Sequence, residues 1–197
     1  MKPIALSFQH ADPARPRRPA VFLDRDGVLN ENRADYVRTW EQVVFLPGAF
    51  AAMQRLASSP FAVVVVTNQS AVGRGLMTVD ELAVINQGIV AAVQQVGGRI
   101  DAVYACPHAP EDACPCRKPR PGMLLQAAQD LGIDLERSHL VGDAVSDVEA
   151  ALAAGVRPVM VRTGRGVKQA LGLAVHGLHH VPVVADLHAA VDLIGVK

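Results

Sequence analysis

Long hydrophobic runs, an excess of charge and aromatic side chains are all scarce in this chain of 197 residues. The longest unbroken apolar runs, such as Phe61–Val66, are far too short to cross a lipid bilayer. Lysine and arginine total 19, as do aspartate and glutamate, which leaves no electrostatic footprint for nucleic acid or an anionic membrane. Aromatic residues make up only 4% of the chain, which disfavours a stacking surface for nucleic acid. We therefore expect neither membrane nor nucleic acid as a partner.

Cysteine is scarce as well, and its placement is informative. The three cysteines cannot all pair within one chain, and they cluster between positions 106 and 116, which favours a metal site over a disulfide framework. The first 19 residues are rich in proline and arginine, and their apolar stretch Ile4–Leu6 is too short for a signal peptide. We expect a flexible N-terminal arm over residues 1–19, a single domain over residues 20–197, a cytoplasmic location and a monomer.

What the sequence does contain is an alternation of short apolar strands with amphipathic helices. Strands are predicted at Ala20–Leu23, Phe61–Val66, Ile100–Ala105, His139–Val141, Pro158–Val161 and Val181–Val184. Helices are predicted at Pro47–Ala57, from a capping box of Thr78 and Glu81 to Val96, at Pro121–Leu131, at Ser146–Ala154 and after Asp186. This alternation predicts an α/β fold with a mostly parallel sheet and helices on both faces.

Unusual polar clusters begin where predicted strands stop. In open α/β sheets, ligands bind outside the carboxyl ends of the strands. A fourth cluster directly precedes a predicted helix, and all four are expected on one rim of the sheet. The clusters are Asp24-Arg25-Asp26-Gly27, Thr67-Asn68-Gln69-Ser70, Gly142-Asp143 with Asp147, and Arg117-Lys118-Pro119.

Asp24 and Asp26 are separated by one residue, so in an extended segment both can face one site while Arg25 points elsewhere. Two carboxylates this close repel each other unless a cation lies between them or one is protonated, and both remedies suit phosphoryl transfer. Each cluster alone also fits an ordinary surface turn, a helix cap or a solvated lysine. Their combination on one rim favours a functional site.

Four stretches resemble the motifs of the haloacid dehalogenase superfamily, and the match covers nearly all of the chain from residue 20 onward. Within that superfamily, the chain most closely resembles the heptose 1,7-bisphosphate 7-phosphatases, with the histidinol-phosphate phosphatases as close relatives. The stretches are Phe22–Asn30 (FLDRDGVLN), Val66–Ser70 (VTNQS), Cys116–Pro119 (CRKP) and Val141–Asp147 (VGDAVSD).

The resemblance implies a fold of the haloacid dehalogenase type without a large cap domain, and a phosphatase that works through an aspartyl-phosphate. Asp24 is then the nucleophile, and Asp26 donates a proton to the leaving oxygen and later accepts one from water. Thr67 and Lys118 hold the phosphoryl oxygens.

The same resemblance implies a catalytic magnesium ion. Its expected ligands are the carboxylates of Asp24 and Asp143 and the backbone carbonyl of Asp26. Asp147 lies one helical turn beyond Asp143, and we expect it to orient Lys118 or a metal-bound water rather than bind the metal.

Three thiolates and one imidazole fit a closed tetrahedral zinc site, which we expect to be structural and to fix the loop carrying Arg117 and Lys118. The alternative is a set of exposed free cysteines beside a solvated histidine, which would be prone to oxidation. The expected ligands are Cys106, His108, Cys114 and Cys116.

Only the stretch between Gly27 and Pro47 and the short zinc loop can overhang the site, which suits a small phosphorylated metabolite. Asp35 and Tyr36 are equally compatible with a purely structural loop, and Arg117 with a surface salt bridge. The resemblance to the heptose phosphatases implies that Asn32, Arg33, Asp35 and Tyr36 bind the substrate, and we expect Asn68, Gln69, Ser70 and Arg117 to do so as well.

The expected substrate is D-glycero-D-manno-heptose 1,7-bisphosphate, cleaved at the 7-phosphate, with a place in lipopolysaccharide or nucleotide-activated heptose biosynthesis. The alternatives are a histidinol-phosphate phosphatase, a broader small-metabolite phosphatase and an inactive phosphate-binding scaffold. The intact set of polar residues argues against the scaffold, because a protein that only binds phosphate needs no acid/base such as Asp26.

Overall fold

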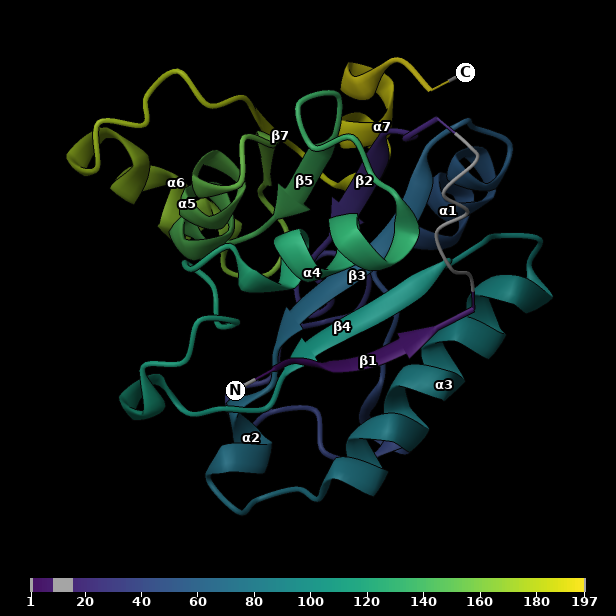
Figure 1. Cartoon of the computed structure of the whole chain (residues 1–197), viewed down its shortest axis with the longest axis vertical. Helices are drawn as coiled ribbons and strands as arrows, with labels where there is room; N and C mark the ends of the chain where they lie inside the picture. The colour runs from purple at the N-terminus through teal and green to yellow at the C-terminus, as the bar shows by residue number, and fades with distance from the viewer. Residues whose placement is uncertain (1, 9–15, 197) are drawn as a thin grey trace.

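A computed structural model describes residues 2–8 and 16–196 of the chain (Figure 1). Its core is a seven-stranded sheet in the order β1-β4-β3-β2-β5-β6-β7, in which only the β1–β4 pair is antiparallel. The predicted α/β fold with a mostly parallel sheet is confirmed. The strands are β1 (Ile4–Ser7), β2 (Ala20–Leu23), β3 (Ala62–Asn68), β4 (Ala102–Cys106), β5 (His139–Gly142), β6 (Arg157–Val161) and β7 (Val183–Val184).

Helices cover both faces of the sheet (Figure 1). Side chains of α1, α3 and α7 pack on one face, and those of α4, α5 and α6 on the other. Among the described residues, no helix is long and apolar enough to cross a membrane. The helices are α1 (Ala49–Ala57), α2 (Ser70–Gly73), α3 (Val79–Gln95), α4 (Gly122–Leu131), α5 (Val145–Ala153), α6 (Gly166–Val175) and α7 (Leu187–Ile194), with single 3₁₀ turns η1 (Trp40–Gln42) and η2 (Pro110–Asp112).

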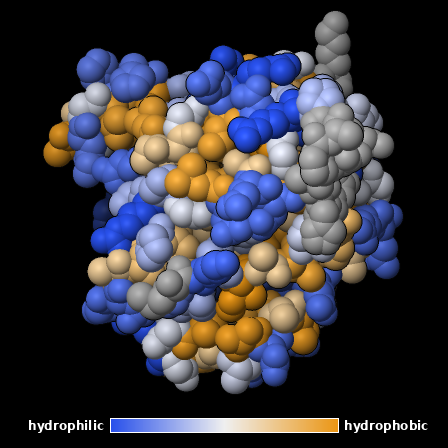
Figure 2. All heavy atoms as spheres, in the orientation of Figure 1, coloured by the Kyte–Doolittle hydropathy of each residue, from blue (hydrophilic) through white to orange (hydrophobic). Residues whose placement is uncertain are grey.

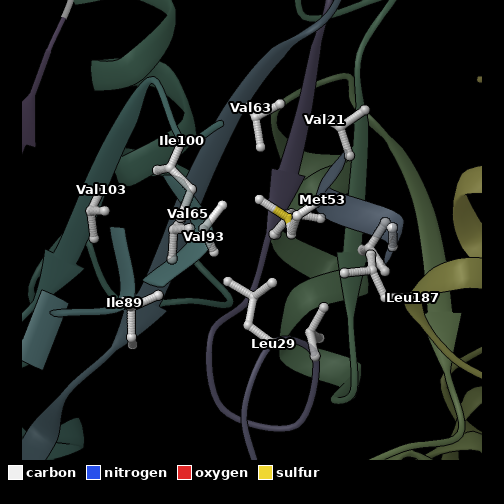
Figure 3. Close-up of a cluster of buried hydrophobic side chains, with 14 of the residues drawn as sticks. Val21, Leu29, Met53, Val63, Val65, Ile89, Val93, Ile100, Val103 and Leu187 are labelled. Atoms are coloured by element: carbon white, nitrogen blue, oxygen red, sulfur yellow. The ribbon is translucent and has the colours of Figure 1, made fainter. Parts of the chain in front are cut away.

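The central strands are buried on both faces, which explains why they are continuously apolar in the sequence. In β2, Val21 and Leu23 belong to the core under α1, α3 and α7, whereas Ala20 and Phe22 belong to the core on the opposite face. Figure 3 shows the first of these cores, where Met53 of α1 lies among the side chains of the strands and of α3. The two cores hold the strand ends in fixed positions.

The N-terminal segment differs from its expected form. Residues Ile4–Ser7 were expected in a flexible arm but form β1, with Ile4 opposite Ala105 of β4. The expectation is wrong for these four residues because the main-chain groups of β4 offer an edge on which they pair. The rest of the expected arm includes residues 1 and 9–15, which lie outside the described residues.

The chain runs from β2 through β3 to β4 on one side of the sheet and from β5 through β6 to β7 on the other. β2 therefore lies between β3 and β5, at the point where the strand order reverses. Ligand sites of open α/β sheets lie at such points, beyond the carboxyl ends of the strands. The polar residues that follow β2, β3 and β5 meet there.

Candidate active site

A cavity of about 360 Å³ lies at this rim. Asp24 follows β2 directly, and its backbone N–H donates to the carbonyl of Val141 in β5 (2.9 Å), which fixes the start of the loop. The cavity is lined by Asp24, Asp26, Tyr36, Thr67, Asn68, Ser70, Pro110, Arg117, Lys118, Pro119, Asp143, Ala144, Ser146, Asp147 and Arg165.

Lys118 is buried at the centre of the site. Its Nζ atom lies 2.9 Å from Oδ1 of Asp24, 2.6 Å from Oδ1 of Asp147 and 2.8 Å from the carbonyl oxygen of Val66. Burial alone would lower the pKa of Lys118, but the charges of Asp147 and Asp24 raise it above its ordinary value. The amide of Asn68 exchanges two hydrogen bonds with the backbone of Lys118. The cation is therefore fixed at both its backbone and its charged end.

Three carboxylates lie close together at this site. Oxygen atoms of Asp24, Asp143 and Asp147 lie within 4.8 Å of one another. Burial, reinforced by Asp147, Asp143 and Asp26 and opposed by Lys118, raises the pKa of Asp24 to about 7. Burial also raises the pKa of Asp143 to about 6, although the N–H of Arg165 opposes this change.

Such a set of crowded oxygen donors fits a magnesium ion, because a divalent cation stabilises the carboxylate forms that burial and mutual repulsion disfavour. Both carboxylate oxygens of Asp147 already have partners in the protein. Its Oδ2 atom accepts a hydrogen bond from the N–H of Ala144 (3.0 Å), and its Oδ1 atom contacts Lys118.

Asp26 lies beside this group, with its carboxylate enclosed by donors. It accepts hydrogen bonds from Nε and Nη2 of Arg25 (3.2 and 3.0 Å), from Nδ2 of Asn30 (2.7 Å) and from Nε2 of Gln69 (2.7 Å). Burial would raise the pKa of Asp26, but Arg25 and these hydrogen bonds lower it below its ordinary value. Arg25 is not among the residues that line the cavity, in agreement with the expectation that it points away from the site. Its wholly buried guanidinium pairs with Asp26, because a buried charge requires an anionic partner.

The predicted substrate-binding residues divide into two groups. Tyr36, Asn68, Ser70 and Arg117 line the cavity. The other four, Asn32, Arg33, Asp35 and Gln69, are not among the described residues that line the cavity. Nδ2 of Asn32 donates to the carbonyl of Asp26 (3.0 Å) and to Asp143 (2.8 Å), the buried Gln69 bonds to Asp26 and Thr67, and Arg33 and Asp35 form an exposed ion pair. These four side chains form their hydrogen bonds and ion pairs with other residues of the protein.

The cysteine loop follows β4 at the same edge of the sheet. The Sγ atoms of Cys106, Cys114 and Cys116 lie 3.4–3.5 Å apart, and Nδ1 of His108 lies 3.5 Å from Cys106 and 3.3 Å from Cys116. Three sulfurs and one ring nitrogen converging in this way form a donor set that fits a tetrahedral zinc ion. Nη1 of Arg117 donates to the carbonyl of His108 (3.2 Å), so the cluster and the cavity wall are directly connected.

One segment of the site was not recognised in the sequence. After β6, Oγ1 of Thr163 donates to the carbonyl of Gly27 (2.6 Å), the N–H of Arg165 donates to Asp143 (2.8 Å), and Nη2 of Arg165 donates to Oδ1 of Asn32 (3.0 Å). The sequence did contain a signal for this segment, namely its position. Thr163-Gly164-Arg165 follows a predicted strand at the same edge as the recognised motifs.

Comparison with known proteins accounts for this arrangement. The HAD-hydrolase-like family model matches residues 115–190. The chain is 40% identical over 171 residues to the D-glycero-beta-D-manno-heptose-1,7-bisphosphate 7-phosphatase of Bordetella bronchiseptica, covering 87% of this chain and 94% of that protein. It is also 40% identical over 151 residues to the phosphatase of the same name from Pseudomonas aeruginosa, covering 77% and 85%. The chain belongs to this phosphatase family.

Solved structures agree with this assignment. The crystal structure of the D,D-heptose 1,7-bisphosphate phosphatase from B. bronchiseptica, complexed with magnesium and phosphate, matches with a TM-score of 0.83 and 39% identity over 89% of this chain and 97% of that one. The corresponding enzyme from Burkholderia thailandensis matches with a TM-score of 0.68 and 35% identity over 90% and 99%. The protein is therefore a phosphatase of the haloacid dehalogenase superfamily, as the motifs predicted.

Proposed function

We propose that the protein hydrolyses the 7-phosphate ester of D-glycero-D-manno-heptose 1,7-bisphosphate. The observation that carries the proposal is the contact of Lys118 with Asp24 at the wall of a cavity that also includes Arg117. A carboxylate beside a fixed cation suits attack on an anionic phosphoryl group, and an arginine suits the second phosphate of a bisphosphate. The relatives from B. bronchiseptica and P. aeruginosa are named for this substrate, which supports the same assignment here.

In the proposed reaction, an oxygen of Asp24 forms a bond to phosphorus as the bond between phosphorus and the sugar oxygen breaks. Asp26 supplies the proton that the leaving oxygen takes up. Water then attacks the phosphorus of the aspartyl-phosphate while Asp26 accepts a proton from that water. This step releases inorganic phosphate and regenerates free Asp24. Lys118 and the hydroxyl of Thr67 stabilise the charge on the phosphoryl oxygens.

The donors around Asp26 favour its carboxylate form in the free protein, whereas the proposed first step requires the acid. A phosphate group brought into the cavity places negative charge beside this carboxylate, and a neighbouring negative charge raises the pKa of a carboxyl group. We therefore propose that Asp26 takes up its proton together with the substrate.

Two metals complete the proposal. Asp24, Asp143 and the carbonyl of Asp26 would hold magnesium, which would supply positive charge against the phosphoryl oxygens. Cys106, His108, Cys114 and Cys116 would hold a structural zinc ion. We also propose a cytoplasmic location, because a cluster of three thiols remains available for metal only where thiols stay reduced.

The test is phosphate release from both anomers of the heptose bisphosphate and from histidinol phosphate under one set of conditions. We expect kcat/KM to be highest for one of the heptose anomers, because Arg117 gives the cavity a cation suited to a second phosphate. A preference for histidinol phosphate would overturn the substrate assignment. Turnover by the Asp24→Asn variant would overturn the aspartyl-phosphate mechanism.

A further inference from the structure

Arg25 occupies an unusual place beside the proposed acid. It is 0% exposed, and its guanidinium lies between the carboxylate of Asp26 and the side chain of Asn86, whose Oδ1 atom accepts a hydrogen bond from Nη1 of Arg25 (3.1 Å). Asn86 comes from α3, 61 residues further along the chain. A buried charge requires partners of this kind, and Arg25 has one on each side.

Asn86 is a polar residue on an otherwise apolar helix face. It lies on the buried side of α3 with Leu82, Ile85, Ile89 and Val90, and is only 5% exposed. An amide on an apolar helix face costs stability unless its polar atoms are bonded. Its bond to Arg25 supplies such a partner, and through Arg25 this face of α3 is connected to the wall of the active-site cavity.

The guanidinium of Arg25 determines how the carboxylate of Asp26 is oriented. Arg25 contacts both oxygens of Asp26 through Nε and Nη2, and such a planar two-point contact fixes the plane of a carboxylate as well as its position. Asn86 in turn fixes the third nitrogen, Nη1. A rotation of the guanidinium about Asp26 would break this bond, so Asn86 opposes it.

A simple structural ion pair would also place Arg25 and Asp26 together. That explanation gives no reason for the pair to lie at the cavity, where the side chain of Asp26 keeps 19% of its surface exposed while that of Arg25 has none. We infer that Arg25 and Asn86 are positioning residues that aim the carboxyl group of Asp26 at the leaving oxygen of the substrate. The inference rests on the acid role of Asp26 in the proposed function.

The test uses the dependence of rate on the leaving group. A general acid matters for a poor leaving group such as phenolate and little for a good one such as 4-nitrophenolate. The measured quantity is kcat/KM for phenyl phosphate divided by kcat/KM for 4-nitrophenyl phosphate. This ratio does not depend on the fraction of protein that is folded, so a loss of stability in a variant cannot imitate the result.

We expect this ratio to fall about tenfold in Asn86→Leu and to stay within about twofold of the unaltered protein in Asn86→Asp, which keeps an oxygen acceptor for Arg25. Gln87→Leu, at the next and exposed position of α3, is the matched control and should leave the ratio unchanged. Asp26→Asn should lower the ratio at least as far as Asn86→Leu.

The outcomes separate the inference from the proposed function. If Asp26→Asn lowers the ratio and Asn86→Leu does not, the positioning role is wrong while the acid role stands. If Asn86→Leu slows both substrates equally, its role is structural and the inference is overturned. An unchanged ratio in Asp26→Asn overturns the acid role, and the positioning role with it.

Discussion

Lys118 contacts two carboxylates of the site, which a lysine that only binds phosphate would not require. Its Nζ atom joins Asp24 and Asp147, both of which are buried, so its removal leaves two uncompensated carboxylates. We expect Lys118→Met to lower kcat/KM by about 10³-fold, since a fixed charge next to the phosphoryl oxygens is lost. The thermal midpoint should fall as well. Kinetic assays and thermal unfolding of the same preparations measure both.

Lys168→Met provides the control for Lys118, because Lys168 is exposed and does not line the cavity. It should change neither kcat/KM nor the thermal midpoint. A Lys118→Met protein that is as active as the Lys168→Met protein would contradict the role given to this cation.

The raised pKa values of Asp24 and Asp143 predict how stability depends on pH without metal. A carboxyl group with a pKa of about 7 in the folded protein and an ordinary, lower value in the unfolded chain binds protons more tightly when folded. Its contribution therefore decreases as pH rises between these two values, and Asp143 acts in the same direction up to about 6. Magnesium favours the carboxylate forms and should reverse the loss.

We therefore expect magnesium to raise the thermal midpoint more at about pH 8 than at about pH 5. Thermal unfolding with magnesium or with a chelator, at both pH values, measures the difference. Asp24→Asn should reduce this difference, because an amide does not ionise. A magnesium effect of equal size at both pH values would contradict the assignment of these carboxylates.

At the residue scale, the sequence was sufficient for groups that directly follow strands. Asp24 and Asp143 directly follow β2 and β5, and Thr67 lies at the end of β3; they meet because these strands are neighbours in a parallel sheet that the apolar runs predict. The side-chain partners could not be predicted in this way. Arg25 turns toward Asp26 because Asn86 of α3 reaches the same place, and this contact between residues far apart in the chain leaves no local pattern in the sequence.

The zinc loop can be tested at the scale of an element. Its four donor atoms converge, and Arg117 is tied to the carbonyl of His108, so the loop positions one wall of the cavity. We expect Cys114→Ser to reduce bound zinc, lower the thermal midpoint and raise KM for the bisphosphate about tenfold, because Arg117 loses its support. Asp24 is unaffected by this change, so turnover should persist at high substrate concentration.

Metal analysis, thermal unfolding and steady-state kinetics measure the three effects of Cys114→Ser. Lys168→Met again serves as a control. A folded, zinc-free protein with an unchanged KM would show that the loop does not position the substrate.

The loop between β6 and α6 makes a different prediction. Gly164 has a φ of +57°, and a Cβ atom there would lie 2.3 Å from Oδ2 of Asp143 and 2.5 Å from Cα of Gly27. Gly155 also has a positive φ, +73°, but a Cβ atom there would meet nothing within 4 Å. Substitutions at both glycines introduce backbone strain, but only a substitution at Gly164 displaces Asp143. Comparing the two therefore distinguishes the two effects.

We expect Gly155→Ala to cost about 1 kcal/mol of unfolding free energy and leave activity unchanged. Gly164→Ala should cost at least as much and also lower kcat/KM about 10²-fold, because Asp143 must move. Denaturant titration and kinetics compare them, and calorimetric titration should show weaker magnesium binding in Gly164→Ala alone. Equal activities in the two variants would contradict a role for this loop in placing Asp143.

A helix with a clear start signal was predicted, whereas α6, whose regularly spaced apolar residues are exposed, was not. The capping box of Thr78 and Glu81 opens α3 as expected, since this signal is local. Helix α6 was not predicted. Its residues Val167, Leu171 and Val175 are exposed, and apolar side chains are visible over the region of α6 in Figure 2, so its apolar spacing does not mark a buried face.

At the scale of the whole molecule, β1 closes the sheet on the β4 side. Ile4 and Leu6 pack against the core under α3 while Ala5 faces outward, so the strand contributes both backbone pairing and burial. The sequence did not predict this strand, because four residues are too short to show a period. Pairing with β4 requires only a free edge on that strand, which is a property of the assembled sheet.

Removal of residues 2–8 should therefore expose the edge of β4 and promote association of the protein, together with a lower thermal midpoint. The active-site carboxylates lie beyond β2 and β5, and Lys118 lies in the loop after β4, where its contacts with Asp24 and Asp147 hold it, so kcat/KM of the remaining monomer should change less than about twofold. Light scattering, thermal unfolding and kinetics test the three parts. Ala5→Lys is the matched control, because its side chain lies on the exposed side of β1 and it should keep the stability of the full chain. A truncated protein that remains monodisperse and equally stable would show that β4 needs no partner at this edge.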